Sequence, residues 1–185
     1  MLDASLLLTP VALERATIVG ELDLADRGYA VLTLHRQGNV LPEALGDIVH
    51  AINGLDLPVV FPIHPRTRKA CEAQGLELGP HVTVTAPLGY LDFTALLAAS
   101  RVVLTDSGGV QKEAYWHRVP CVTLRNATEW PETVAAGWNR LAGSDAERIA
   151  GAVDGARAPI DHPDLYGDGR AAEAIATHLA TMSAP

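Results

Sequence analysis

The chain has 185 residues, of which 48% are hydrophobic, and this length and composition suit the buried core of one domain rather than two. Its formal net charge of -8 argues against a surface for duplex nucleic acid, which normally carries a basic patch. No apolar run is long enough to cross a bilayer, and residues 1–8 lack the basic segment of a secretory signal, so neither membrane nor nucleic acid is an expected partner.

The opening segment, from Asp3 to about Asp26, is expected to form an amphipathic helix with a break near Pro10. Short β-rich runs then alternate with helical stretches. The predicted strands are Tyr29–Leu34, Val59–Ile63, His81–Thr85, Val102–Thr105, Cys121–Leu124 and Arg140–Ala142. The predicted helices are Pro42–Asn53, Arg66–Gln74, Leu91–Ala99, Val110–His117, Glu132–Ala136, Asp145–Val153 and a last one from about Gly169. This alternation predicts an α/β fold with a doubly wound parallel sheet, Rossmann-like, and helices on both faces.

The two cysteines, Cys71 and Cys121, fall in a predicted helix and a predicted strand, without metal-type spacing to each other or to any histidine. We interpret both as small apolar packing residues in a reducing compartment. The cytoplasm is therefore the expected location.

The most informative segment is 105–114, where a buried strand passes through two glycines directly into a helix. Glycines allow a tight turn and a close approach of a ligand to the backbone. If Ser107 caps the helix, the amides of Gly108, Gly109 and Val110 point outward at the positive end of the helix dipole. The segment therefore predicts a cradle for a diphosphate.

Glu113 lies one helical turn beyond this cradle, on the same face. A carboxylate there can accept hydrogen bonds from two adjacent hydroxyls, such as those of a ribose. The structural alternative is an ordinary β-to-α turn with a serine cap and a solvated Lys112–Glu113 pair, because short glycine motifs are weak signals.

Polar residues also follow other strands at the same edge of the predicted sheet, where doubly wound folds bind ligands. They are His35 and Arg36 after the first strand, His64 after the second, and Tyr90 and Phe93 after the third. Each has a structural interpretation as well. A histidine after a strand is often only a hydrogen-bonding residue, His64 between two prolines could fix a rigid turn, and an aromatic residue at a helix start usually serves the core.

Trp130 and Trp138 are likewise more often packing aromatics than rings that stack on a base.

Taken in order, several segments resemble the C-terminal half of the non-hydrolysing UDP-N-acetylglucosamine 2-epimerases. They are 33–36 with Asn39, 61–69, 104–111 with Glu113 and Ala114, 128–133, and 166–169. The resemblance implies that residues 1–185 form a single UDP-binding domain, one half of a GT-B type architecture with two domains. The helix from about Gly169 is then expected to pack toward an N-terminal domain absent from this chain.

The resemblance also implies roles. Ser107, Gly108 and Gly109 would hold the UDP diphosphate, Glu113 the ribose, and the Tyr90 to Phe93 region the uracil, while Arg36 and His64 complete the UDP site. His35 would stand beside the leaving diphosphate as the catalytic residue. Family members epimerise C2 by eliminating UDP and adding it back, so the growing charge on the leaving group must be stabilised. No metal or nicotinamide cofactor is implied.

Two departures from the family pattern stand out. Gly38 occupies a position where the family usually has a glutamate, and Lys112 replaces a common acid, which we expect to be a surface change. Family enzymes also carry the acidic residues that transfer protons at the sugar carbons in their N-terminal domain. This chain alone is therefore not expected to epimerise its substrate.

Three origins for the chain stay open: a domain of a longer enzyme, one half of a split enzyme, or a binding remnant. The expected partners are UDP or a UDP-N-acetylhexosamine, the missing half, and a possible homo-oligomer. Two other functions are considered, half of a GT-B nucleotide-sugar glycosyltransferase and a stand-alone sugar-nucleotide-binding module.

Overall fold

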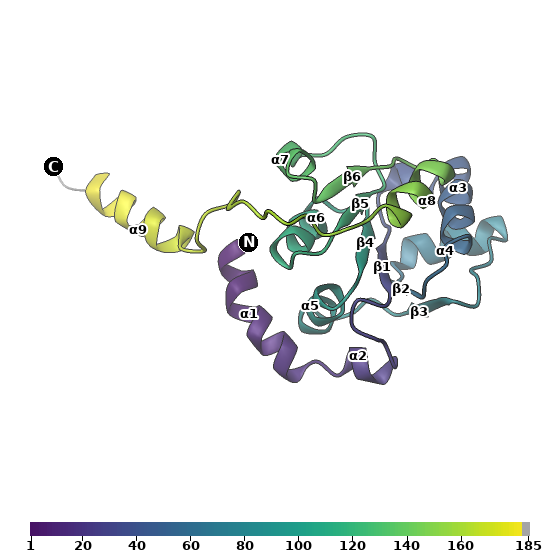
Figure 1. Ribbon diagram of the computed structural model, residues 1–185, viewed down its shortest axis with the longest axis horizontal. Helices are drawn as coiled ribbons and strands as arrows, with labels where there is room; N and C mark the ends of the chain where they lie inside the picture. The colour runs from purple at the N-terminus through teal and green to yellow at the C-terminus, as the bar shows by residue number, and fades with distance from the viewer. Residues whose placement is uncertain (183–185) are drawn as a thin grey trace.

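Six short parallel strands form one sheet in the order β3-β2-β1-β4-β5-β6. We describe a computed structural model in which residues 1–182 are placed (Figure 1). The strands are β1 (Ala30–Thr33), β2 (Val59–Pro62), β3 (Val82–Thr85), β4 (Val102–Thr105), β5 (Cys121–Thr123) and β6 (Asn139–Leu141). All six predicted strands are present, and the prediction of a doubly wound α/β sheet is confirmed.

The strand order reverses between β1 and β4, which lie side by side although two strands separate them in the sequence. Leu32 pairs with Leu104 and Thr33 with Thr105, and the hydroxyls of the two threonines lie 2.6 Å apart. Segments that leave these two strands therefore emerge next to each other, at the kind of crevice where such sheets bind ligands.

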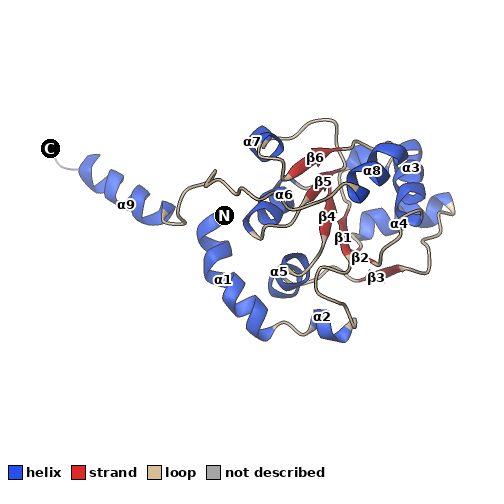
Figure 2. Cartoon of the chain, viewed as in Figure 1, coloured by secondary structure: helices blue, strands red, loops and turns tan. Residues whose placement is uncertain are grey.

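Helices cover both faces of the sheet (Figure 2). Because successive strand residues point to opposite faces, Leu32 packs with α3 (Pro42–Asn53) and α8 (Ala146–Asp154), whereas Val31 packs with α5 (Tyr90–Ala98) and α6 (Gly108–Trp116). Each fully buried side chain of this size contributes about 1.5–3 kcal/mol, so the two cores fix the strands that carry the site. The remaining helices are α4 (Pro65–Gln74), α7 (Pro131–Ala135) and the 3-10 helix η1 (Gln37–Val40).

The N-terminal segment differs from its prediction, because α1 (Leu2–Arg15) continues through Pro10. Proline lacks the amide that would bond one turn back, which is why a break was expected. Packing of α1 against α5 keeps the helix continuous, and the hydroxyl of Thr9 bonds back to the carbonyl of Ser5. The break falls at Ala16, whose backbone is extended, before the short helix α2 (Ile18–Glu21).

The C-terminal part leaves the sheet as an extended segment, residues 156–170, which we call the strap. It leads to α9 (Ala171–Met182), which projects away from the rest of the chain (Figure 1). Within residues 1–182, no helix has the length and apolar character needed to span a bilayer.

Candidate functional site

The predicted helix cap is present at the start of α6. The backbone of Ser107 is extended, and its hydroxyl oxygen accepts a 3.4 Å hydrogen bond from the amide of Val110. The amides of Gly108 and Gly109 stand at the head of this nine-residue helix, where no intrahelical partner exists. Together with the helix dipole, these amides form a region of positive potential with free hydrogen-bond donors at the edge of the sheet.

Neither glycine at the start of α6 has an unusual backbone conformation, and only Gly108 is crowded. Five glycines among the described residues have a positive φ, and neither Gly108 nor Gly109 is one of them. A Cβ on Gly108 would lie 3.3 Å from Glu129 Oε2 and 3.4 Å from Trp130 Nε1, which leaves almost no room for it. At Gly109 the nearest atom would be Met1 Cε at 3.5 Å, an ordinary contact. The neighbours of both glycines are side chains of this chain, so the predicted close approach of a ligand to their backbone stays a prediction.

Glu113 lies one turn along α6, half-buried, and burial raises the pKa of its carboxyl above the ordinary value. Within residues 1–182 its carboxylate makes no hydrogen bond or ion pair. A desolvated carboxylate without a partner is stabilised when neutral donors such as hydroxyls give it hydrogen bonds. The environment of Glu113 therefore suits the ribose-binding role expected for it.

The loop after β1 is held against the start of α6 by a buried carboxylate, Asp106. Its oxygens accept hydrogen bonds from the amide of His35 at 3.0 Å, the amide of Arg36 at 2.8 Å and Asn39 Nδ2 at 3.3 Å. The ring nitrogen Nδ1 of His35 lies 3.1 Å from Asp106 Oδ1. His35 and Arg36 are thereby brought to the edge that carries Ser107, and both side chains remain partly exposed there.

His64 combines both interpretations considered for it. Its Nδ1 accepts a 3.1 Å hydrogen bond from the amide of Arg66, so it caps α4 and fixes the turn. Its ring centroid also lies 6.1 Å from that of His35, which places it beside the β1 loop.

Tyr90 and Phe93 differ in exposure although both lie in the first turn of α5. The Tyr90 side chain is 40% exposed, whereas Phe93 packs partly into the core beside Val31. Of the two, only Tyr90 has a ring open enough to stack on a base. Phe93 fits the structural interpretation better.

Two further residues near the start of α6 received no role from the sequence, Arg125 and Glu129. Arg125 follows β5 and donates two hydrogen bonds to the Glu129 carboxylate, at 2.8 and 2.9 Å, while Arg36 Nη2 lies 3.6 Å from the same group. The hydrogen bonds from Arg125 lower the pKa of Glu129 to about 2. Two guanidinium groups and one permanent carboxylate thus lie beside Gly108. An arginine directly after a strand at this edge was the available signal.

Lys112 is not the solvated surface residue that was expected. Its Nζ lies 4.1 Å from the ring centroid of Trp130, 4.2 Å from that of Tyr166 and 5.7 Å from that of Trp116. The ammonium therefore sits in a cage of three aromatic rings, a favourable cation–π arrangement. This cage joins α6 to the strap, and it confirms that Trp130 is a packing aromatic. Trp138 is also a packing residue, because it is buried and its Nε1 donates to the carbonyl of Asp161.

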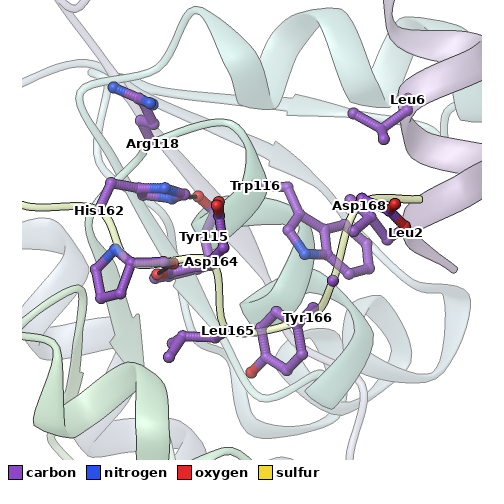
Figure 3. A pocket seen from close by; sticks show the side chains of 12 residues that line it. Leu2, Leu6, Tyr115, Trp116, Arg118, His162, Asp164, Leu165, Tyr166 and Asp168 are labelled. Atoms are coloured by element: carbon purple, nitrogen blue, oxygen red, sulfur yellow. Dashed lines mark hydrogen bonds between the residues drawn. The ribbon is translucent and has the colours of Figure 1, made fainter. Parts of the chain in front are cut away.

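A separate cavity of about 270 Å³ lies between α1, the end of α6 and the strap. Figure 3 shows Leu2 and Leu6 of α1 on one side of it and Asp164 and Leu165 of the strap on the other. None of its lining residues belongs to the predicted nucleotide site. The candidate site is instead the open edge formed by the β1 loop and the start of α6.

Comparison with known proteins identifies the family of the chain. Residues 1–180 match the family model of the UDP-N-acetylglucosamine 2-epimerases. The chain belongs to this family. A Pseudomonas aeruginosa UDP-2,3-diacetamido-2,3-dideoxy-D-glucuronate 2-epimerase is 45% identical over 164 residues, which are 84% of this chain and 45% of that enzyme.

Solved structures of the family share the fold described above. The Methanocaldococcus jannaschii UDP-GlcNAc 2-epimerase, crystallised with UDP-GlcNAc and UDP, has a TM-score of 0.85 and 35% identity, over 97% of this chain and 52% of that one. The calicheamicin glycosyltransferase CalG4 is similar at 22% identity and a TM-score of 0.58, which shows a common fold alone. The chain spans about half the length of these relatives.

Proposed function

We propose that this chain is the UDP-binding C-terminal half of a UDP-sugar 2-epimerase. The observation that carries the proposal is the start of α6, where the amides of Gly108 and Gly109, without intrahelical partners, stand about one turn before the unpartnered Glu113 carboxylate. Such a pair matches the two parts of UDP that lie next to each other, an anionic diphosphate and a ribose with two hydroxyls. Tyr90 is the side chain we assign to the uracil.

The proposed substrate is a UDP sugar with an acetamido group at C2. The family is described for UDP-N-acetylglucosamine, and the Pseudomonas relative is described for a diacetamido uronate, so both names share UDP and a 2-acetamido group. Residues of the missing half are expected to distinguish between such sugars.

In the proposed elimination, the C2 proton passes to a base, the C2–H electron pair forms a C1=C2 double bond, and the C1–O bond to UDP breaks with its electron pair moving to the diphosphate. We assign the stabilisation of that negative charge to the α6 amides, His35 and Arg36, which share this edge of the sheet, as preorganised donors and cations. His35 is the residue we place beside the leaving oxygen.

We further propose that the isolated chain binds UDP without turnover. Proton removal at C2 needs a free base. At this edge Asp106 is committed to the β1 loop and Glu129 to two arginines, and Glu113 is the carboxylate that we assign to the ribose. The base and acid are then supplied by the other half of the enzyme, against which we expect α9 to pack. The apolar side chains of Ile175 and Met182 are exposed on α9.

The cytoplasm remains our proposed location, and it fits the presence of two buried free thiols, Cys71 and Cys121.

Calorimetric titration of the 185-residue chain with UDP tests the proposal directly. We expect saturable binding of UDP, weaker binding of pyrophosphate, and no epimerisation until an N-terminal half of a family member is added. A folded sample without UDP affinity up to about 1 mM would refute it. Acceptor-dependent sugar transfer by the reconstituted protein would instead favour the glycosyltransferase alternative.

A further inference from the structure

We propose that Asp106 is a positioning residue that fixes both the ring orientation and the tautomer of His35, so that Nε2 is the nitrogen offered to a ligand. The catalytic use of His35 rests on the proposed function. The geometry that positions its ring is independent of that function.

The surroundings of Asp106 define its charge state and its role. Its side chain is fully buried, and three N–H donors, the amides of His35 and Arg36 and the Nδ2 group of Asn39, reach its oxygens. A buried carboxylate is stable only when such donors satisfy it, and charge-assisted hydrogen bonds of this kind are the strong ones. Asp106 is therefore an ionised acceptor held in one orientation.

The fourth neighbour of the carboxylate is the His35 ring. Nδ1 lies 3.1 Å from Oδ1, an ion-pair contact rather than an aligned hydrogen bond, and two lone pairs at that distance would repel, so the tautomer with its proton on Nδ1 is favoured. A neutral imidazole has only one N–H, so Nε2 is left with the lone pair. When the ring is protonated, Nε2 becomes a donor, and the Asp106 carboxylate balances the new charge.

The residues around the His35 ring come from the ends of three strands rather than from one loop. Asp106 follows β4, His35 follows β1, and Asn39 also donates to the carbonyl of Leu124 at the end of β5. The three strands therefore fix one side of the imidazole. The other side stays open, because the His35 side chain is 45% exposed.

A histidine elsewhere in the site provides an internal control. Nδ1 of His64 accepts a hydrogen bond from the amide of Arg66, so its lone pair is on Nδ1 and its proton on Nε2. His35 and His64 should therefore be opposite neutral tautomers although their rings are only 6.1 Å apart.

Long-range ¹⁵N–¹H correlation spectra of the histidine-labelled full chain read these tautomers directly. With His35→Gln and His64→Gln used only to assign the signals, the high-pH spectrum should show a protonated Nδ1 for His35 and a protonated Nε2 for His64. A His35 ring with its proton on Nε2, or one that exchanges between both forms, would overturn the proposal. No ligand is needed, so a failure of UDP binding leaves this measurement valid.

Asp106→Asn then tests whether the tautomer matters for the ligand. We expect His35 to become a mixture of tautomers, His64 to stay unchanged, and UDP affinity to fall by roughly tenfold or more, because a hydrogen bond to a charged group is lost. Reduced affinity with an unchanged His35 tautomer would mean that Asp106 only supports the loop, and the proposal would be wrong. If the variant does not fold, the wild-type spectrum still decides the question.

If wild-type protein shows the expected tautomers yet binds no UDP, the proposed function fails and the positioning of His35 by Asp106 stands.

Discussion

The indole nitrogen of Trp130 donates a 2.8 Å hydrogen bond to the carbonyl oxygen of Gly108, which ties the loop after β5 to the first turn of α6. The same indole forms one wall of the aromatic cage around Lys112. The position of the amides at the start of α6 therefore depends on a residue 22 positions later in the sequence.

Trp130→Phe should weaken pyrophosphate binding several-fold and lower the free energy of unfolding by about 1 kcal/mol, because one hydrogen bond is lost while most of the ring packing remains. Urea denaturation and calorimetry measure the two effects. Trp138→Phe is the matched control, since its indole donates to the strap at Asp161 instead. It should lose similar stability and bind pyrophosphate normally. Equal binding losses in both variants would count against a role of Trp130 at the cradle.

Glu113→Ala should weaken UDP more than pyrophosphate, because only UDP has the ribose hydroxyls that the carboxylate is proposed to accept from. A difference of roughly tenfold is expected, the usual value of a hydrogen bond to a charged group. Gly109→Val should weaken both ligands while the protein stays folded, since a Cβ there meets only ordinary contacts in the free protein. Equal losses of both ligands in the Glu113 variant would remove the ribose role.

The stability of the chain should depend on pH through Glu113. Burial raises the pKa of this carboxyl in the folded protein, so its stabilising contribution is complete below the ordinary pKa of a glutamate and is lost as the pH rises through the folded value. Glu113→Gln should therefore be more stable than wild type at pH 7, with a difference that shrinks toward pH 4. Urea denaturation across this range measures it, and a difference independent of pH would contradict the assignment.

Glu129→Gln should raise UDP affinity several-fold. With a pKa of about 2, the Glu129 carboxylate is ionised at every working pH, and it holds both Arg36 and Arg125 beside the amides proposed to bind the diphosphate. Neutralising it removes a like charge and frees two cations. The gain should diminish at high salt, where charges at an exposed edge are screened. A weaker UDP complex would show that Glu129 instead holds the arginines in their binding positions.

Lys112→Met should lower the free energy of unfolding by about 1 kcal/mol, since the side chain keeps its length but loses the cation–π attraction of three rings. Lys69→Met on the exposed side of α4 is the control, with an expected change within about 0.5 kcal/mol. Thermal unfolding of both variants makes the comparison. No difference between them would mean that the cage contributes no stability.

The sheet could be predicted from the sequence because its signals are local. Apolar β-branched runs such as 102–105 and 59–62 are buried on both faces, and a serine before two glycines marks the start of α6. Conversely, Pro10 was misjudged because its local preference for a break is outweighed by packing of α1 on α5.

The parts of the site that were missed depend on partners distant in sequence. Lys112 looks like a surface residue until Trp130 and Tyr166 are placed around it. Similarly, nothing near Asp106 in the sequence indicates that His35 will donate to it, because the two residues are 71 positions apart. Residue types at strand ends identified the edge of the sheet, but not which side chains pair across it.

The seam where Thr33 meets Thr105 joins two halves of the sheet, and the two threonines are 72 positions apart in the sequence. A nucleotide bound across this seam would hold β1 and β4 together. Hydrogen–deuterium exchange of the amides in both strands would then slow down by the same factor.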